Sequence, residues 1–315
     1  MLKDYLQLFR IPNTFTVPPD ILGGYFVTTI SDVNLINYCD ILMLVFSSVF
    51  LYIGGLVTND LFDIDRDMVE RPNRPLPSRK IKKSTACSLA IFLFGLGILL
   101  SSFLSITSTI ISIFLVLMIL SYNYRLKNGI SRPFLMGGIR SLNIVYGASS
   151  NTNYFDFIAG TNVTIQMYTP LACLTILTLA VFIHIFTLTF LSARETHNEF
   201  GNPNKKRLSL KMVYAYYLSL FIVILFLGLN YLPYKIHFTI LIGLFLLCVN
   251  LLFFSILWKK KYGYADIQFL VKNMIVLLIL LDSSFVVGSV GVYFGIISLG
   301  LIIPCVLMGK KVKMT

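Results

Sequence analysis

Charged residues are scarce in this chain. Asp, Glu, Lys and Arg together supply only 13% of its 315 residues, whereas hydrophobic residues supply 57%, and the mean hydropathy is positive. A soluble domain usually carries about 25% charged residues. Its interior would be too small to bury apolar surface in the amount found here. The composition therefore excludes an ordinary soluble domain and predicts a polytopic membrane protein.

Paired cysteines are missing as well. The five cysteines lie singly in or beside apolar runs, and no two of them form a CxxC pair. This spacing indicates buried thiols and favours neither a zinc site nor a disulfide framework. The sequence also lacks a basic patch interleaved with stacking aromatic residues, so the net charge of +12 does not indicate a nucleic-acid partner.

Long hydrophobic runs recur along the whole chain. A helix needs about 20 apolar residues to cross a hydrocarbon core about 30 Å thick. Ten runs of suitable length stand between charged segments, at 14–36, 41–62, 84–105, 107–124, 131–149, 168–193, 210–231, 236–258, 266–285 and 288–309. We therefore expect one all-α membrane domain over residues 1–315, with nine transmembrane helices and a tenth, C-terminal span.

The basic residues are distributed unevenly over the segments between these spans. If the N-terminus is cytoplasmic, 23 of the 26 lysines and arginines fall in segments on the cytoplasmic side. Such a bias sets the orientation of a membrane protein by the positive-inside rule. It predicts a multi-pass protein of the cell membrane whose N-terminus faces the cytoplasm, together with two polar cap loops at about 63–83 and 194–210.

The most polar stretch of the chain follows the second predicted span. It reads NDLFDIDRDMVERPNRPLPS over residues 59–78 and places carboxylates, arginines and prolines directly after an apolar run. At about 100° per residue, four of its side chains share one helix face at the water boundary, whereas Asp65 points away from them. The four are Asn59, Asp60, Asp63 and Asp67.

A second acidic cluster ends the sixth predicted span, on the same side of the membrane. It contains Glu195, Asn198 and Glu199. The carboxyl end of a helix already has negative partial charge, so carboxylates there should be compensated by cations. Oxygen ligands suit Mg²⁺, and arginines suit the oxygens of a phosphate.

The cationic residues around the two clusters are Arg66, Arg71, Arg74, Lys127 and Arg194. Metal-binding oxygens beside these cations predict a site for Mg²⁺ and a diphosphate at the membrane edge. The alternative interpretation is a network in which carboxylates and arginines only neutralise one another.

Several polar side chains interrupt the spans themselves. An arginine within a span is costly unless it pairs or reaches water, so Arg140 and Asn143, one helical turn apart, are expected to line an interior cavity. Asp20 follows two prolines in the first span and must face protein or water, and Asp282 in the ninth span has no evident partner in the sequence. The residues expected to orient a second substrate are Asn13, Arg140, Asn143 and His184.

These motifs resemble those of the UbiA superfamily of intramembrane prenyltransferases. The stretch at 59–78 is similar to that family's NDxxDxxxD signature followed by RPxRPxPS, and YNYRLK resembles its tyrosine–lysine element, with Tyr122 and Lys127 matching. The segments NTFTVPPDILGGYF, MGGIRSLN and SARE resemble the EboC-like branch. The likeness extends from about Leu8 to the last span and implies helices around a central cavity, open to the cytoplasmic side and laterally to lipid.

The resemblance also implies an activity: transfer of a prenyl group from a polyprenyl diphosphate to an aromatic or polar-lipid acceptor within the membrane. Mg²⁺ held by the two acidic clusters would neutralise the leaving diphosphate. Asp63, Asp67, Lys127 and Arg194 would act in catalysis, and the diphosphate would be bound by Arg66, Arg71, Arg74 and Tyr122. One departure lies in the second motif, where family members usually carry aspartates; the longer glutamates and the amide of Asn198 would change the metal geometry.

Two other functions remain open at this point. A terpene cyclase on the same scaffold would ionise the same diphosphate without an acceptor, in an aromatic-lined pocket. A non-enzymatic membrane carrier would be expected to show an internal repeat, and the carboxylate motif is not repeated at comparable positions in the two halves. The polar side chains of Arg140, Asn143 and His184 favour the transferase over the cyclase.

Overall fold

Every regular element that the structure describes is a helix. The computed structural model describes residues 2–29, 36–124, 131–151, 168–193, 203–259 and 264–311. The N-terminal half contains α1 (Leu2–Leu8), α2 (Ile11–Thr14), α3 (Val17–Thr28), α4 (Tyr38–Phe62), α5 (Ile64–Glu70), α6 (Lys83–Ser102), α7 (Ile106–Tyr124) and α8 (Ser131–Ala148). The C-terminal half contains α10 (Tyr168–Ala193), α11 (Pro203–Tyr231), α12 (Lys235–Leu257), α13 (Tyr264–Val290), α14 (Val292–Gly300) and α15 (Ile302–Lys311). The predicted all-α fold class is confirmed.

Eight segments in the described part of the chain are long and apolar enough to cross a membrane. The expected spans at 14–36 and 131–149 are not among them, because α3 has only 12 residues and α8, with two arginines among its 18 residues, is not apolar enough. The last expected span is interrupted between α14 and α15, at Leu301. The helices therefore fit a multi-pass membrane protein, but they do not confirm a count of nine spans and a tenth.

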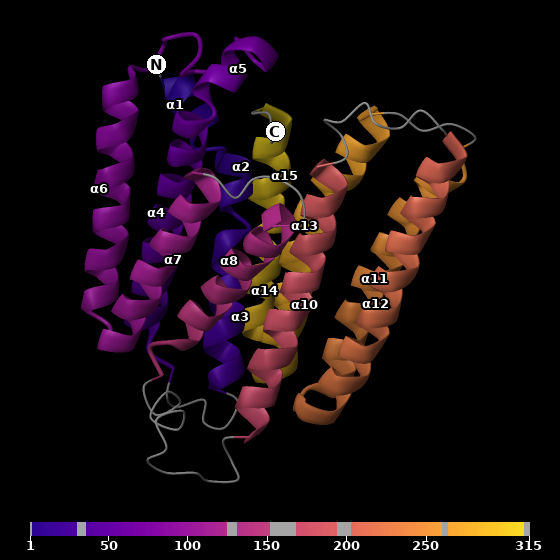
Figure 1. Cartoon of the computed structure of the whole chain (residues 1–315). Helices are drawn as coiled ribbons and strands as arrows, with labels where there is room; N and C mark the ends of the chain where they lie inside the picture. The colour runs from indigo at the N-terminus through magenta and orange to yellow at the C-terminus, as the bar shows by residue number, and fades with distance from the viewer. Residues whose placement is uncertain are drawn as a thin grey trace.

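The short helix α3 occupies the middle of the bundle. It contacts α4, α8, α10, α13 and α14, and all but one of its residues are buried. In Figure 1, α6 lies on one flank of the bundle and α11 and α12 lie on the other. Pro18 and Pro19 stand in the first turn of α3, where the backbone N–H groups have no acceptor within the helix. The two prolines therefore interrupt no hydrogen bond, and Asp20 enters the protein interior, as expected from the sequence.

Two glycines bring α3 and α8 close together. A β-carbon at Gly24 would lie 1.9 Å from the carbonyl oxygen of Ile144, and one at Gly147 would lie 2.4 Å from that of Ile21. In lipid, where apolar surface is not driven together by water, helices associate through such close van der Waals packing. The crossing thus sets the separation between the polar side chains that α3 and α8 carry.

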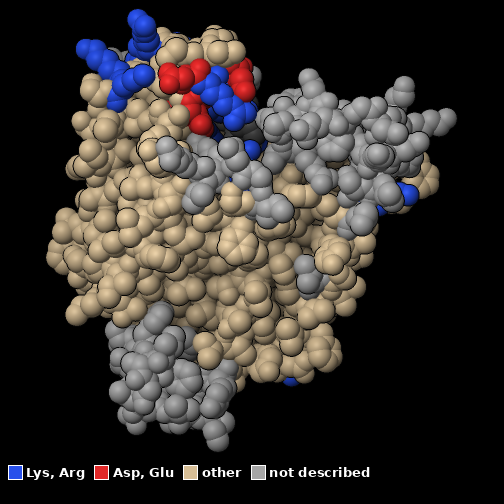
Figure 2. All heavy atoms as spheres, in the orientation of Figure 1, with Lys and Arg blue, Asp and Glu red and all other residues tan. Residues whose placement is uncertain are grey.

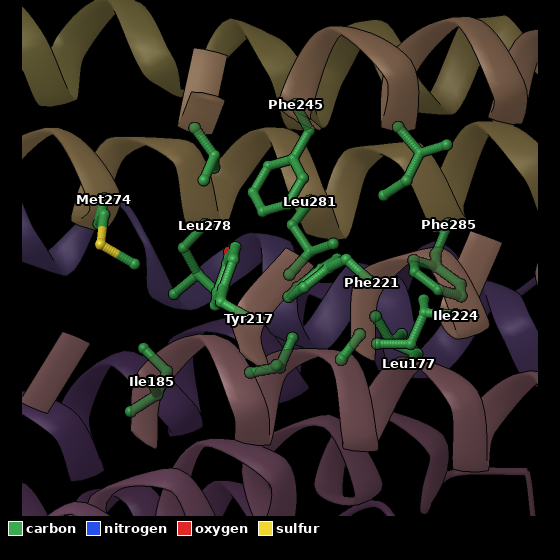
Figure 3. Close-up of a cluster of buried hydrophobic side chains, with 14 of the residues drawn as sticks. Leu177, Ile185, Tyr217, Phe221, Ile224, Phe245, Met274, Leu278, Leu281 and Phe285 are labelled. Atoms are coloured by element: carbon green, nitrogen blue, oxygen red, sulfur yellow. The ribbon is translucent and has the colours of Figure 1, made fainter. Parts of the chain in front are cut away.

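An apolar core joins α10, α11, α12 and α13. Figure 3 shows its side chains interlocking, and among those labelled Leu177, Phe221, Phe245 and Phe285 are fully buried. The rings of Phe221 and Phe245 are tilted against each other with centroids 5.1 Å apart. This core is the scaffold that holds the C-terminal helices against α3.

Charged side chains gather at one end of the bundle, which we call the polar end. Both chain termini, α1 and α5 lie at this end in Figure 1, and Figure 2 shows acidic and basic atoms clustered there above a largely uncharged surface. The proline-rich segment 71–82 is folded over the same end. Its backbone N–H groups at Ser78 and Ile81 donate to the carbonyl oxygens of Arg74 and Pro75, at 3.0 and 3.2 Å, and Leu76 is buried.

Candidate active site

The junction of α4 and α5 positions the first acidic motif. α4 ends at Phe62 and α5 begins at Ile64, yet the Asp63 N–H still donates to the Asn59 carbonyl oxygen at 3.0 Å, and the Asp67 N–H donates to that of Asp63 at 2.8 Å. Helical spacing therefore continues across the junction. As a result Asn59, Asp63 and Asp67 line one pocket of about 280 Å³ at the polar end.

Asp60, the fourth residue of the predicted face, lies outside the lining of this pocket. It is 4% exposed, and its Oδ1 accepts hydrogen bonds from Arg10 Nη2 at 2.7 Å and from Arg74 Nη1 at 3.4 Å. Asn59 Nδ2 donates to the same oxygen at 3.4 Å. Two cations already compensate this carboxylate, for which the sequence pattern predicts a metal ligand, and it stands apart from the Asn59, Asp63 and Asp67 side chains that line the pocket.

An ion pair also holds Asp67. Arg74 reaches in from the proline-rich segment, and its Nη1 lies 2.7 Å from Asp67 Oδ2. Burial lowers the pKa of Arg74, an effect opposed by the charges of Asp60 and Asp67. The predicted network of carboxylates and arginines is therefore present, and it forms part of the wall of a pocket.

The rim of the pocket carries a more exposed ion pair. Arg66 Nε donates to Glu70 Oε1 at 2.9 Å, and both residues line the pocket. This hydrogen bond raises the pKa of Arg66 and lowers that of Glu70. Both side chains are about half exposed, so the pair is screened by solvent and contributes little to stability.

The same pocket brings together most of the predicted diphosphate-binding residues. Besides the carboxylates it is lined by Arg66, Arg71, Arg74 and Tyr122. Sequence reasoning missed five further polar lining residues, which are Arg10, Tyr52, Glu70, Asn123 and Arg132. Asn123, beside Tyr122 in YNYRLK, donates to Thr58 Oγ1 at 2.9 Å and so joins α7 to α4. The sequence offered one signal for the two arginines, since Arg10 lies four residues before the first predicted span and Arg132 is the second residue of the fifth.

A second pocket of about 210 Å³ adjoins the first on the side of α3 and α8. The residues that line both pockets are Arg10, Tyr52, Leu56, Ile119, Met136 and Ile139. The inner pocket is mostly apolar, and its polar lining consists of Arg10, Asn13, Thr16, Ser48, Tyr52, Thr189, Arg140 and Asn143. Three of the four predicted acceptor-orienting residues thus face one pocket.

Arg140 is the best-anchored residue of the inner pocket. Its Nη1 donates to Asp20 Oδ2 at 2.6 Å and to the Thr16 carbonyl oxygen at 3.2 Å, and its Nη2 donates to Thr16 Oγ1 at 2.5 Å. The guanidinium carbon lies 5.2 Å from the centroid of the Tyr52 ring. Asn143 donates to the same Asp20 oxygen at 3.0 Å. The expectation that Arg140 would pair and line a cavity therefore fits the structure.

His184, the fourth predicted acceptor-orienting residue, lines neither pocket. It is fully buried in the core of α10–α13, with Nδ1 2.6 Å from the Tyr217 hydroxyl and Nε2 2.9 Å from the Met274 carbonyl oxygen. Both ring nitrogens are occupied by the scaffold. The structure therefore does not bring His184 to the site.

The second acidic motif cannot be placed in this geometry. Lys127, Arg194, Glu195, Asn198 and Glu199 all lie outside the described residues. Within the described residues no three His, Cys, Asp or Glu side chains form a group that could hold a metal ion. Asn59, Asp63 and Asp67 nevertheless offer oxygen donors in one pocket, which fits part of a Mg²⁺ sphere, because Mg²⁺ is commonly held by one or two carboxylates, waters and substrate phosphates.

Loss of Arg74 should destabilise the protein in a way that Mg²⁺ partly reverses. Arg74→Leu leaves the buried Asp60 and Asp67 with one cation fewer, and we expect the free energy of unfolding to fall by about 3 kcal/mol. Added Mg²⁺ should raise the unfolding temperature of the variant more than that of the wild type, because Asp67 is freed to bind it. Thermal unfolding in detergent measures both effects. Arg79→Leu removes a charge from the exposed part of the same segment and should match the wild type; equal stabilisation of all three proteins by Mg²⁺ would contradict the prediction.

Comparison with known proteins finds matches over most of the chain. The model of the UbiA prenyltransferase family matches residues 17–278. A digeranylgeranylglyceryl phosphate synthase of Sulfurisphaera tokodaii is 31% identical over 256 residues, which cover 80% of this chain and 86% of that protein. A protein of the same name from Methanocaldococcus jannaschii is 36% identical over 105 residues, or 33% of this chain and 36% of the relative.

Solved structures share the fold. A UbiA homologue of Archaeoglobus fulgidus bound to GPP and Mg²⁺ superposes with a TM-score of 0.63 at 15% identity, over 94% of this chain and 99% of that one. A structure described as that of a digeranylgeranylglyceryl phosphate synthase gives a TM-score of 0.60 at 23% identity, over 92% and 98%. The protein is thus an integral, multi-pass membrane protein, and the chain belongs to the UbiA prenyltransferase family.

Proposed function

We propose that this protein transfers a prenyl group from a prenyl diphosphate to a polar-lipid acceptor within the membrane, with Mg²⁺ as cofactor. The observation that carries the proposal is the pair of joined pockets. The outer pocket combines carboxylates with five arginines at 10, 66, 71, 74 and 132, and the inner pocket is mostly apolar with a few fixed polar groups. The names of the relatives support a glyceryl phosphate lipid as the acceptor class.

The outer pocket is the place for the diphosphate. Asn59, Asp63 and Asp67 would hold Mg²⁺ together with Glu195, Asn198 and Glu199 of the second motif, and the bound metal would offset charge on the leaving group. Arg66, Arg71 and Arg74 would donate charge-assisted hydrogen bonds to its oxygens, with Lys127 and Arg194 as further cations and Tyr122 at the wall. These groups bind the diphosphate more strongly once its bond to the prenyl carbon has broken, because its negative charge increases at that step.

The wall shared by the two pockets is the place for the reacting carbon. The bond between the allylic carbon and the diphosphate oxygen breaks, and the electron pair leaves with the diphosphate. A hydroxyl oxygen of the acceptor then bonds to that carbon and gives up its proton to an oxygen of the released diphosphate. Leu56, Ile119, Met136 and Ile139 line the shared wall and would exclude water, which otherwise competes with the acceptor. Asn13, Arg140 and Asn143 would orient the acceptor.

We further propose that the polar end faces the cytoplasm and that the host membrane is the cell membrane. The distribution of lysines and arginines supports this orientation. It places the outer pocket where water-soluble Mg²⁺ and diphosphate are exchanged, while both prenyl chains stay in lipid.

The purified protein tests the proposal. It would be incubated in nanodiscs with Mg²⁺, geranylgeranyl diphosphate and a glyceryl phosphate that carries one geranylgeranyl chain. Diphosphate release should match, mole for mole, a new lipid with two chains detected by mass spectrometry, and omission of Mg²⁺ should abolish both. Diphosphate release with a hydrocarbon product and no need for acceptor would indicate a cyclase instead. Release of no diphosphate with any allylic diphosphate or acceptor would favour a carrier.

A further inference from the structure

Tyr52 of α4 lies where the two pockets meet. On the same face of the helix, Ser48 lies one turn before it in the inner pocket and Asn59 lies two turns after it in the outer pocket. Among the described residues that line both pockets, four are apolar, Arg10 is paired with Asp60, and Tyr52 alone carries a hydroxyl. Tyr52 therefore stands between the side proposed for the acceptor and the side proposed for the metal.

The hydroxyl of Tyr52 makes no hydrogen bond with any residue that the structure describes. Tyrosine hydroxyls inside a protein usually find a partner. Others in this bundle do so: the Tyr146 hydroxyl lies 2.7 Å from Ser47 Oγ, and that of Tyr217 lies 2.6 Å from His184 Nδ1. The Tyr52 hydroxyl is thus available to a molecule that enters the pockets.

The ring of Tyr52 is nevertheless held in place. The guanidinium carbon of Arg140 lies 5.2 Å from the ring centroid, which is the geometry of a cation–π contact. Arg140 is itself fixed by hydrogen bonds to Asp20 at 2.6 Å and to the Thr16 hydroxyl at 2.5 Å. A ligand can therefore bond to an oriented Tyr52 hydroxyl without first breaking a hydrogen bond within the protein.

The inner pocket lacks a base of its own. None of the residues described along its lining is Asp, Glu or His. The hydroxyl of the acceptor becomes acidic as its oxygen bonds to the allylic carbon, and an apolar pocket disfavours the positive charge that would otherwise remain there. The departing diphosphate can take the proton, but it lies in the outer pocket. The proton must therefore pass the wall that the two pockets share.

We propose that Tyr52 is a catalytic residue that relays this proton, an inference that rests on the proposed transfer reaction. The Tyr52 oxygen accepts a hydrogen bond from the acceptor hydroxyl, and its own O–H donates to a diphosphate oxygen. When the acceptor oxygen bonds to the allylic carbon, the acceptor proton passes to the Tyr52 oxygen and the Tyr52 proton passes to the diphosphate. The tyrosine is regenerated, and neither pocket is left with a new charge on the protein.

Kinetics of Tyr52→Phe test the relay. The phenylalanine keeps the ring against Arg140 and removes only the hydroxyl, so kcat for transfer should fall about 100-fold, within the range typical of general acid–base groups. The KM values for diphosphate and acceptor should stay within about threefold of the wild type, because the proton moves only in the transition state. Tyr38→Phe makes the same change at the other end of α4, at a side chain that is 65% exposed, and should match the wild type.

Isotope exchange in the donor separates the relay from mere placement of the diphosphate. Geranylgeranyl diphosphate would carry ¹⁸O at the oxygen that joins carbon to phosphorus, and recovered substrate would be analysed by ³¹P NMR. If the proton cannot leave, the allylic cation returns to the diphosphate, and the label moves to a non-bridging oxygen. Tyr52→Phe should therefore show more label exchange per product formed than the wild type does. A misplaced diphosphate would lose exchange and transfer together.

Thermal unfolding adds a measurement that needs no activity. Because the hydroxyl has no partner in the described protein, Tyr52→Phe should unfold at the wild-type temperature. A lower unfolding temperature, an unchanged kcat, or an equal loss of transfer and label exchange, measured beside an active wild type, would overturn the relay and leave the transfer reaction standing. Absence of transfer in the wild type would instead overturn the proposed function, and with it the relay.

Discussion

Asp67→Asn is expected to reduce Mg²⁺-dependent release of diphosphate by about 100- to 1,000-fold, the cost commonly seen when one preorganised electrostatic group is lost from an active site. Asp67 lines the outer pocket and is 4% exposed, and its Oδ2 is already held by Arg74 at 2.7 Å. The asparagine keeps the size of the side chain but removes the charge that would attract the metal. We therefore expect kcat to fall and the Mg²⁺ concentration for half-maximal rate to rise.

A matched variant lies two residues away. Asp65 is exposed and does not line the pocket, so Asp65→Asn makes the same chemical change on the same short helix without touching the site. Its rate should remain close to that of the wild type. If Asp67→Asn retained full diphosphate release, or if both variants lost it equally, the assignment of the outer pocket as the metal and diphosphate site would be wrong.

The ion pair between Asp67 and Arg74 also predicts that Arg74 moves when the metal binds. The arginine compensates a carboxylate that would otherwise be buried without a partner, and the metal would compete for the same oxygen. Binding of Mg²⁺ and diphosphate would then move Arg74 from the carboxylate to a phosphate oxygen. The same guanidinium can serve both states because it has several donors in a fixed plane.

The first acidic motif was largely predictable from the sequence because its spacing is local. Asn59, Asp63 and Asp67 recur every four residues, and backbone hydrogen bonds across the junction at Asp63 preserve that spacing. The direction in which the Asp60 side chain points could not be predicted from this spacing. Its partner Arg10 is 50 residues away in the sequence, and a helical-wheel argument holds no information about contacts between elements.

The inner pocket shows even more clearly that contacts between helices cannot be read from the sequence. The sequence marked Asp20, Arg140 and Asp282 as costly in lipid, which correctly indicated that the first two face protein. Their positions depend on α8 and α13 both packing against α3, and that arrangement is set by tertiary packing. His184 was marked by the same rule, yet the core supplies partners to both of its nitrogens. Polarity within a span thus predicts that a partner exists and leaves open whether it is substrate or scaffold.

Gly24→Ala tests whether the helix crossing sets the geometry of the inner pocket. The added β-carbon would lie 1.9 Å from the backbone carbonyl oxygen of Ile144, which no rotation of a side chain can relieve. Overpacking usually costs about 1–3 kcal/mol, and a clash between backbones should lie at the upper end of that range. The unfolding temperature should fall accordingly, and the KM for the acceptor should rise, because α3 carries Asp20 and α8 carries Arg140.

Gly95→Ala is the control for this substitution. Gly95 lies on α6, and a β-carbon there would have no heavy atom within 4 Å. Alanine is the better helix former by about 1 kcal/mol, so this variant should be as stable as the wild type or slightly more stable. A Gly24→Ala protein with wild-type stability and an unchanged KM for the acceptor would show that α3 and α8 can separate freely. In that case the close crossing could not be what fixes Arg140 against Asp20, and the position of the guanidinium would depend on the hydrogen bonds alone.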